Sequence, residues 1–238
     1  MKRSFNYASI GSFFRFPDNK PTEVLLVDYL NDEGNIEVRL SGGTVQLSDV
    51  KDAIDIYLSK ANPASLDRSI FWLPRQIEEM NISFQQELEE DKSLERHSKN
   101  LILEDYLRKI FNKLDQYHVP EKDIEKILTC SRDITMAREV NEETAAEPVG
   151  KIFQASSRFA SSHEKCGYVG VELSAPDEYS GSGDKDIVRS YWLRIEDAVR
   201  KIASKHYSYL ESAICYVVEN NLHTRSEELK KYCRANNH

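Results

Sequence analysis

Glu23-Val-Leu-Leu-Val-Asp-Tyr-Leu30 is rich in residues that favour β-strands, and shorter strand signals surround it between residues 9 and 50. Residues 35–40 alternate apolar and polar side chains, as a strand with one buried face does. Turn signals follow these segments at Asn31-Asp-Glu-Gly34 and Ser41-Gly-Gly43. Four short strands cannot bury two sheet faces unless the sheet curls up, so this segment predicts a small antiparallel barrel.

The arrangement resembles the SH3-like and Tudor-type small barrels. The resemblance is carried by Gly11 at the start of the first strand, the long second strand, the hairpins at Gly34 and Gly42-Gly43, and the short last strand before Ser48-Asp-Val50. It covers less than a fifth of the chain and implies a barrel domain over residues 1–58.

In that family, such barrels bind peptides, modified side chains or nucleic acid through aromatic residues near the loops. The aromatic residues available for partner binding here are Phe13, Phe14, Phe16 and Tyr29. The alternative is that most of these rings fill the barrel.

A helical pattern follows the strand-rich segment. Residues 59–138 are predicted to form an acidic helical region, in which residues 101–117 are an amphipathic helix. Residues 139–150 lose the apolar period and are predicted to be a linker. Residues 151–238 are predicted to be α-rich, with one strand at 167–173.

Apolar residues recur at alternating spacings of four and three from Val188 to Tyr216, which predicts one long helix over residues 187–219. Such a helix would be about 50 Å long, which exceeds most single-domain cores. Part of its stripe is therefore expected to contact a partner chain, and the candidate residues are Trp192, Ile195 and Val199. The predicted fold class is α+β, with a small N-terminal antiparallel β-barrel, a mainly α-helical body and this long C-terminal helix.

Charge is distributed unevenly along the 238 residues, whose formal net charge is −8. Residues 76–147 hold 18 acidic and 10 basic side chains, and the remainder of the chain balances. An acidic middle segment argues against a general nucleic-acid coat protein. A basic cluster at 189–205 is either a solvated helix face or a phosphate contact made by Arg189, Arg194, Lys201 and Lys205.

Two arginine–histidine spacings resemble the R-x(4–6)-H pattern of HEPN ribonucleases. The pairs are Arg200 with His206 and Arg158 with His163, although Phe159 replaces the polar residue expected after the arginine. The resemblance implies that histidine moves protons at a ribose hydroxyl while arginine stabilises the phosphate. Because Arg200 and His206 do not share a helix face, they would have to converge across a dimer.

No other motif indicates catalysis. The four cysteines are scattered and lack C-x-x-C spacing, so neither a disulfide framework nor a zinc site is predicted, and no cofactor is expected. No run of about 18 apolar residues occurs, which predicts no membrane span and a cytoplasmic location.

The preferred hypothesis is therefore a non-enzymatic adaptor subunit of a larger intracellular complex, which binds another protein or a second copy of itself. The alternatives are a HEPN-like, metal-independent ribonuclease dimer and a nucleic-acid-binding accessory factor.

Overall fold

A computed structural model describes residues 7–91, 96–146, 152–154, 166–182 and 184–233. The chain divides into two compact units, a sheet unit formed by residues 1–43 and 136–238 and a helical unit formed by residues 44–135.

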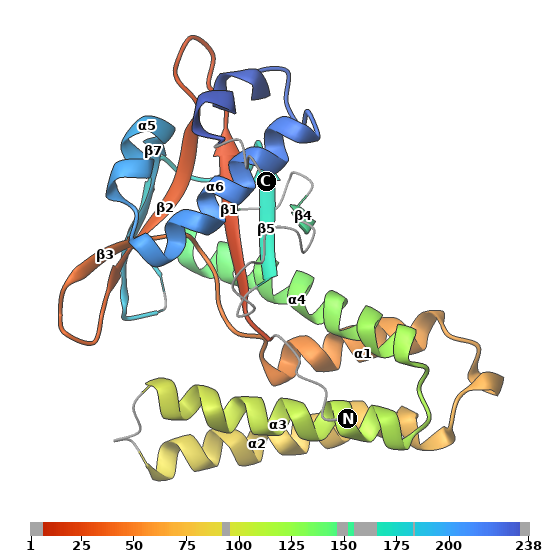
Figure 1. The fold of residues 1–238 in the computed structure, drawn as a ribbon. Coiled ribbons are helices and arrows are strands. Elements are labelled where there is room, and N and C mark those ends of the chain that lie inside the picture. The colour runs from red at the N-terminus through yellow and green to blue at the C-terminus, as the bar shows by residue number, and fades with distance from the viewer. Residues whose placement is uncertain (1–6, 92–95, 147–151, 155–165, 183, 234–238) are drawn as a thin grey trace. The chain divides into compact units, whose positions relative to one another are not determined.

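The sheet unit is built around one mixed β-sheet (Figure 1). Its strands follow the order β4-β5-β1-β2-β7-β6, and β3 pairs with the end of β2. Strands β1 and β5 are parallel, and the other pairs are antiparallel. The strands are β1 (Ser9–Arg15), β2 (Glu23–Leu30), β3 (Ile36–Arg39), β4 (Ile152–Gln154), β5 (Cys166–Val171), β6 (Glu178–Tyr179) and β7 (Ile187–Arg194).

Helices pack on both faces of this sheet. One face, which includes Phe14 and Val24, packs against α5 (Ile195–Lys201), α6 (Ser204–Glu219) and the 3₁₀ helix η4 (Ser226–Tyr232). Figure 1 shows α6 lying across β2, β1 and β5. The opposite face, which includes Phe13 and Leu25, packs against the last turns of α4 (Glu121–Thr144) through Met136 and Val140.

The predicted small barrel is wrong, and so is the resemblance to SH3-like and Tudor barrels. Residues 9–30 do form strands, but they are central strands of the seven-stranded sheet, and β1 pairs in parallel with β5 over 150 residues away. Strands covered on both faces read as nearly continuous apolar runs, as β2 does. Strand β1 is buried along six of its seven residues, although it contains two serines and a glycine. Helices from distant parts of the chain supply the burial that curling would have supplied.

The predicted long helix over residues 187–219 is also wrong. Residues 187–194 form β7, which pairs with β2 along seven residues. The rest is two helices, α5 and α6, separated where Ile202 and Ala203 adopt extended backbone angles. Val188, at the start of the supposed apolar stripe, is exposed.

A disulfide joins Cys215 on α6 to Cys233 after η4. This bond is not evident from the sequence, because a separation of 18 residues forms no recognisable motif. The bond ties the last described turn of the chain to the helix that covers the sheet.

The helical unit consists of α1 (Leu47–Lys60), the 3₁₀ helices η1 (Pro63–Ser65) and η2 (Arg68–Trp72), α2 (Leu73–Glu90), α3 (Arg96–Gln116) and the first part of α4. The predicted helix at 101–117 is confirmed, and its apolar stripe is buried: Leu103, Leu107, Ile110, Phe111 and Leu114.

A buried polar contact joins the two ends of this unit. The Asp49 carboxylate accepts the Gln46 amide at 2.9 Å at the start of α1, and it accepts the Thr135 hydroxyl from α4 at 2.8 Å. Asp49 therefore caps one helix and connects it to another.

The segment proposed as a linker, residues 139–150, is helical through Thr144 because α4 continues to that residue. Residues 147–150 lie outside the described residues.

Candidate functional site

The aromatic residues expected on a binding surface lie in the core of the sheet unit. Phe13 and Phe14 are fully buried on opposite faces of β1, and Phe16 and Tyr29 are nearly so. Phe16 stacks on the His223 ring with centroids 4.0 Å apart. The Phe13, Phe14 and Phe16 rings pack between the sheet and its covering helices, whereas Tyr29 packs with Val27 and Ile187 of the sheet itself.

The residues expected to contact a partner chain along the long helix also pack within the sheet unit. Ile195 is buried and Val199 is packed against the same core cluster under α5 and α6, while Trp192 is buried on the opposite face of the sheet. The spacing of these residues reflects packing within the sheet unit, so we do not propose them as part of a partner-binding surface.

The basic residues of the 189–205 cluster are mostly compensated by acids. Arg189 contacts Asp28 at 2.8 Å and Glu178 at 3.1 Å. Arg194 pairs with Asp197, and Lys205 pairs with Glu37 at 2.8 Å.

The pairing of Glu37 shows in its pKa. The Lys205 and Arg39 hydrogen bonds lower the pKa of Glu37 to about 2. Lys201 is exposed on α5. Each paired cation already has a carboxylate partner, which weakens its attraction for phosphate.

The Arg200 and His206 side chains do not share a surface. Arg200 is exposed on α5 and pairs with Glu196 at 3.3 Å. The His206 side chain is 6% exposed, and its Nδ1 accepts the Leu40 amide at 3.3 Å. Arg158 and His163 lie outside the described residues.

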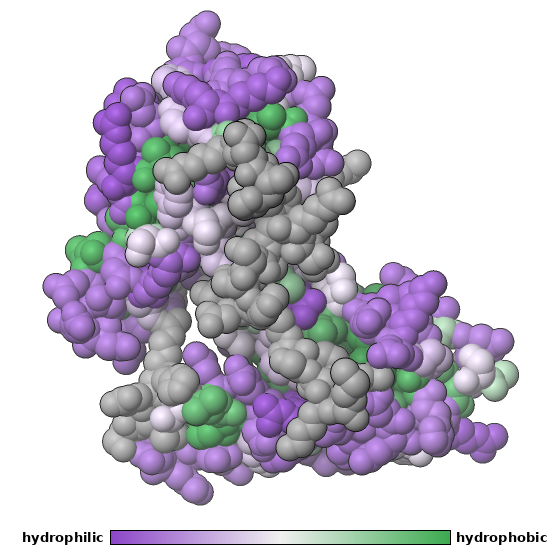
Figure 2. Space-filling model, in the orientation of Figure 1, coloured by the Kyte–Doolittle hydropathy of each residue, from purple (hydrophilic) through white to green (hydrophobic). Residues whose placement is uncertain are grey.

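Large apolar side chains are exposed mainly on the helical unit. Figure 2 shows one face of the molecule, on which separate apolar patches lie among hydrophilic atoms. Among the described residues, those exposed on the sheet unit are Leu30, Ile36 and Val188, and those on the helical unit are Ile56, Phe71, Trp72, Ile82 and Leu101.

Phe71 and Trp72 are adjacent in the chain, and both are exposed, at 44% and 62%. They lie at the end of η2, between the fully buried Ile70 and Leu73. The Asp67 carboxylate caps η2 by accepting the Ser69 amide at 2.8 Å. The two buried neighbours anchor this turn, so the rings between them are directed outward.

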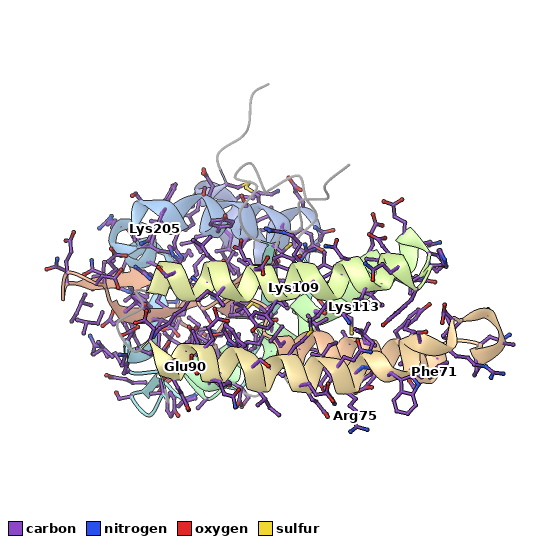
Figure 3. The ribbon with its side chains drawn as sticks, turned by 90° about the horizontal axis from the view of Figure 1, so that it is seen from below. Phe71, Arg75, Glu90, Lys109, Lys113 and Lys205 are labelled. Atoms are coloured by element: carbon purple, nitrogen blue, oxygen red, sulfur yellow. A yellow bond between two sulfur atoms is a disulfide. The ribbon has the colours of Figure 1, made fainter. Side chains whose placement is uncertain are left out.

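Arg75 lies one helical turn beyond this pair and is exposed like it, with a Glu79 contact at 3.5 Å. Figure 3 shows the Phe71 and Arg75 side chains extending from the same outer side of η2 and α2, away from α3. We call Phe71, Trp72 and Arg75 the aromatic corner. In the sequence, Phe71, Trp72 and Leu73 form an apolar group before Pro74, and nothing in their order shows that only Leu73 packs inward.

A second chemically distinctive residue is Glu143 on α4, whose side chain is 8% exposed. Its Oε2 accepts the Gly42 amide at 3.2 Å. Burial raises the pKa of Glu143 to about 8, and the Glu139 carboxylate one turn earlier acts in the same direction. Sequence reasoning missed this acid, although it continues the buried stripe of Met136 and Val140 at helical spacing.

Among the described residues, no helix combines the length with the apolar composition needed to cross a bilayer. In the same residues, no three His, Cys, Asp or Glu side chains are grouped so that they could hold a metal ion.

No family model matches this sequence, and no curated protein matches it. Among solved structures, the chain is similar to the NUDIX domain of Shewanella oneidensis NrtR, determined as a cocrystal with ADP ribose. The TM-score is 0.42 and the identity 12%, over 93% of this chain and 90% of that chain. That neighbour is not an SH3-like or Tudor barrel.

Proposed function

We propose that this protein is a non-catalytic interaction protein whose helical unit binds another protein through the aromatic corner. The observation that supports this proposal is the exposure of Phe71 and Trp72 side by side, with Arg75 next to them. Tryptophan and arginine are enriched among the residues that dominate binding energy at protein interfaces.

The exposed area of the Phe71 and Trp72 rings is large enough to contribute several kcal/mol to binding. At the exposed fractions of these two rings, a partner that covers both removes roughly 250 Å² of side-chain surface from water. Such burial contributes about 6 kcal/mol before the costs of association. The expected partner surface is an apolar pocket for the rings, bordered by a carboxylate that can replace Glu79 as the partner of Arg75.

The test uses a photo-crosslinking amino acid at position 72 of the full chain, expressed in its native host with nuclease treatment of the extract. The matched control carries the crosslinker at position 36, because Ile36 is 59% exposed but lies on β3 of the sheet unit. We expect one protein adduct from position 72 and none of the same identity from position 36.

The partner is then purified and its affinity measured with wild type, Trp72→Ala and Ile36→Ala. We expect Trp72→Ala to weaken binding by about 30-fold or more, as loss of a central interface residue does, and Ile36→Ala to leave affinity unchanged. Equal affinity for the two variants, or equal crosslinking from the two positions, would overturn the proposal.

A further inference from the structure

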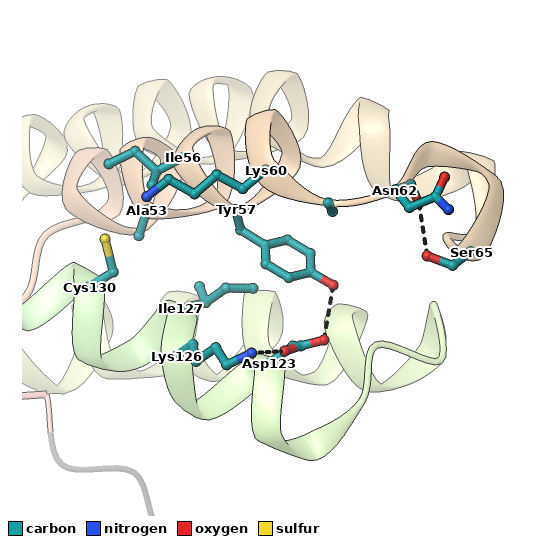
Figure 4. Close-up of a pocket in the computed structure, with 11 residues that line it drawn as sticks. Ala53, Ile56, Tyr57, Lys60, Asn62, Ser65, Asp123, Lys126, Ile127 and Cys130 are labelled. Carbon is teal, nitrogen blue, oxygen red and sulfur yellow. Dashed lines mark hydrogen bonds and ion pairs between the residues drawn. The ribbon is translucent and has the colours of Figure 1, made fainter.

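A groove in the helical unit lies between the second half of α1 and the first half of α4 (Figure 4). Its volume is about 440 Å³, within the range of about 300–1,000 Å³ that is usual for small-molecule sites. It is separate from the aromatic corner, none of whose residues line it. Its lining combines an apolar floor with polar groups at two positions.

The floor is apolar and comes from both helices. Ala53 on α1 and Ile127 on α4 are almost fully buried, while Ile56 is partly exposed. An apolar molecule that lies on this floor would cover Ile56 and would remove its surface from water.

At one position the polar groups already satisfy one another. The Tyr57 hydroxyl donates to Asp123 Oδ2 at 3.4 Å, and Lys126 Nζ donates to Asp123 Oδ1 at 2.6 Å (Figure 4). Burial, and then the Asp123 charge, raise the pKa of Tyr57, so the phenol stays protonated and keeps donating. The Asp123 charge is therefore neutralised by Lys126.

At the other position, an ammonium group has no counter-ion among the described residues. Lys60 lines the groove at the end of α1, and within the described residues no ion pair or hydrogen bond occupies its Nζ. Cys130 lies on the facing helix. Burial, and then Asp133, raise the pKa of its thiol against the opposing effect of Lys60. The thiol is thus uncharged at neutral pH and does not compensate Lys60.

We propose that this groove binds a small amphipathic monoanion, an organic carboxylate whose apolar chain lies on Ile56 and Ile127 and whose carboxylate pairs with Lys60. The uncompensated ammonium selects an anion over a cation. The apolar floor selects a hydrocarbon body, and affinity should rise about fourfold with each added methylene.

The experiment uses octanoate as the probe and Cys130 as the reporter. In a Cys166→Ser background kept free of reductant, Cys130 is the one free thiol among the cysteines, because Cys215 and Cys233 are bonded to each other. We expect octanoate to slow alkylation of Cys130 by iodoacetamide, with half-protection at an octanoate concentration on the order of 1 mM. Octylamine should not protect, and butyrate should protect far less.

Site-specific variants complete the test, with a nitrogen-15 NMR titration as the second readout. Lys60→Gln should weaken octanoate binding at least tenfold. Lys109→Gln, on the exposed side of α3, is the matched control and should leave binding unchanged. Equal protection by octanoate and octylamine, no effect of Lys60→Gln, or no octanoate-induced shifts in α1 and α4 would each overturn the proposal. These outcomes are independent of partner binding at the aromatic corner.

Discussion

Substitution of the buried Glu143 by glutamine tests the packing of the last turns of α4 within the sheet unit. The carboxyl lies against the Ser41–Gly43 segment and accepts the Gly42 amide, while Glu139 contributes a second acid nearby. Burial raises the pKa of Glu143 from its ordinary value of 4.5 to about 8. Glutamine keeps the shape and the acceptor oxygen but carries no titratable proton.

The sign of the effect follows from proton binding. Between pH 4.5 and pH 8, the folded protein holds a proton on Glu143 that the unfolded chain has released, so stability falls as pH rises through this window. Each pH unit costs about 1.4 kcal/mol, which amounts to about 5 kcal/mol over the whole window. Above pH 8 both states are ionised and the dependence on Glu143 ends. The Glu143→Gln variant lacks this slope and should be several kcal/mol more stable than wild type at pH 8.5.

The assay is urea unfolding of wild type and variant from pH 5 to pH 9, followed by the fluorescence of Trp192 in the sheet unit in a Trp72→Phe background. The difference in unfolding free energy between the two proteins isolates Glu143 from all other titrating groups. Glu142→Gln is the matched control, because Glu142 is more exposed and pairs with Arg138. A stability difference between wild type and Glu143→Gln that stays constant from pH 5 to pH 9 would refute the reasoning.

Three further predictions concern the stability of the sheet unit. Gly42→Ala should destabilise it by about 3 kcal/mol, because the new Cβ meets the β1 backbone. Gly34→Ala, at φ +79° with open space around it, should cost about 1 kcal/mol, and urea unfolding midpoints of the two variants make the comparison. Cys215→Ser should lower stability by about 3 kcal/mol through loss of the bond to Cys233, and reductant should lower the midpoint of wild type but not that of the variant. Phe14→Ala should cost about 3–5 kcal/mol in unfolding free energy by leaving a cavity under α6, and a ring that served mainly as a surface contact would show a change below about 1 kcal/mol.

The local sequence pattern predicts an element correctly when the spacing of its apolar residues fits a helix or a strand but not both. The helix at 101–117 was predicted because its apolar residues recur at helical spacing and are buried on one side. The strand at 23–30 was predicted from its β-branched and aromatic composition, and it is β2.

Pattern alone misassigned residues 187–194, because Trp192 and its apolar neighbours fit a helical spacing as well as a strand. The strand is selected by β2, whose free edge pairs with it, and by Asp28, which accepts bonds from Arg189 and Tyr191 across the two strands. Both partners lie more than 150 residues earlier in the chain, so a pattern of neighbouring residues does not include them.

The exposed or buried state of each candidate functional residue was likewise set by long-range packing. On the sequence alone, Phe13 and Phe14 could either bind a partner at the surface of a small barrel or fill that barrel. In the structure, helices from the second half of the chain cover both sides of β1. Phe71 and Trp72 are large apolar residues, yet burial of Ile70 and Leu73 directs them outward. Residue order specifies which segments are helical or extended when their period is unambiguous. Which face of each segment meets water depends on what packs against it, because burial is a property of contacts between segments that are distant in the chain.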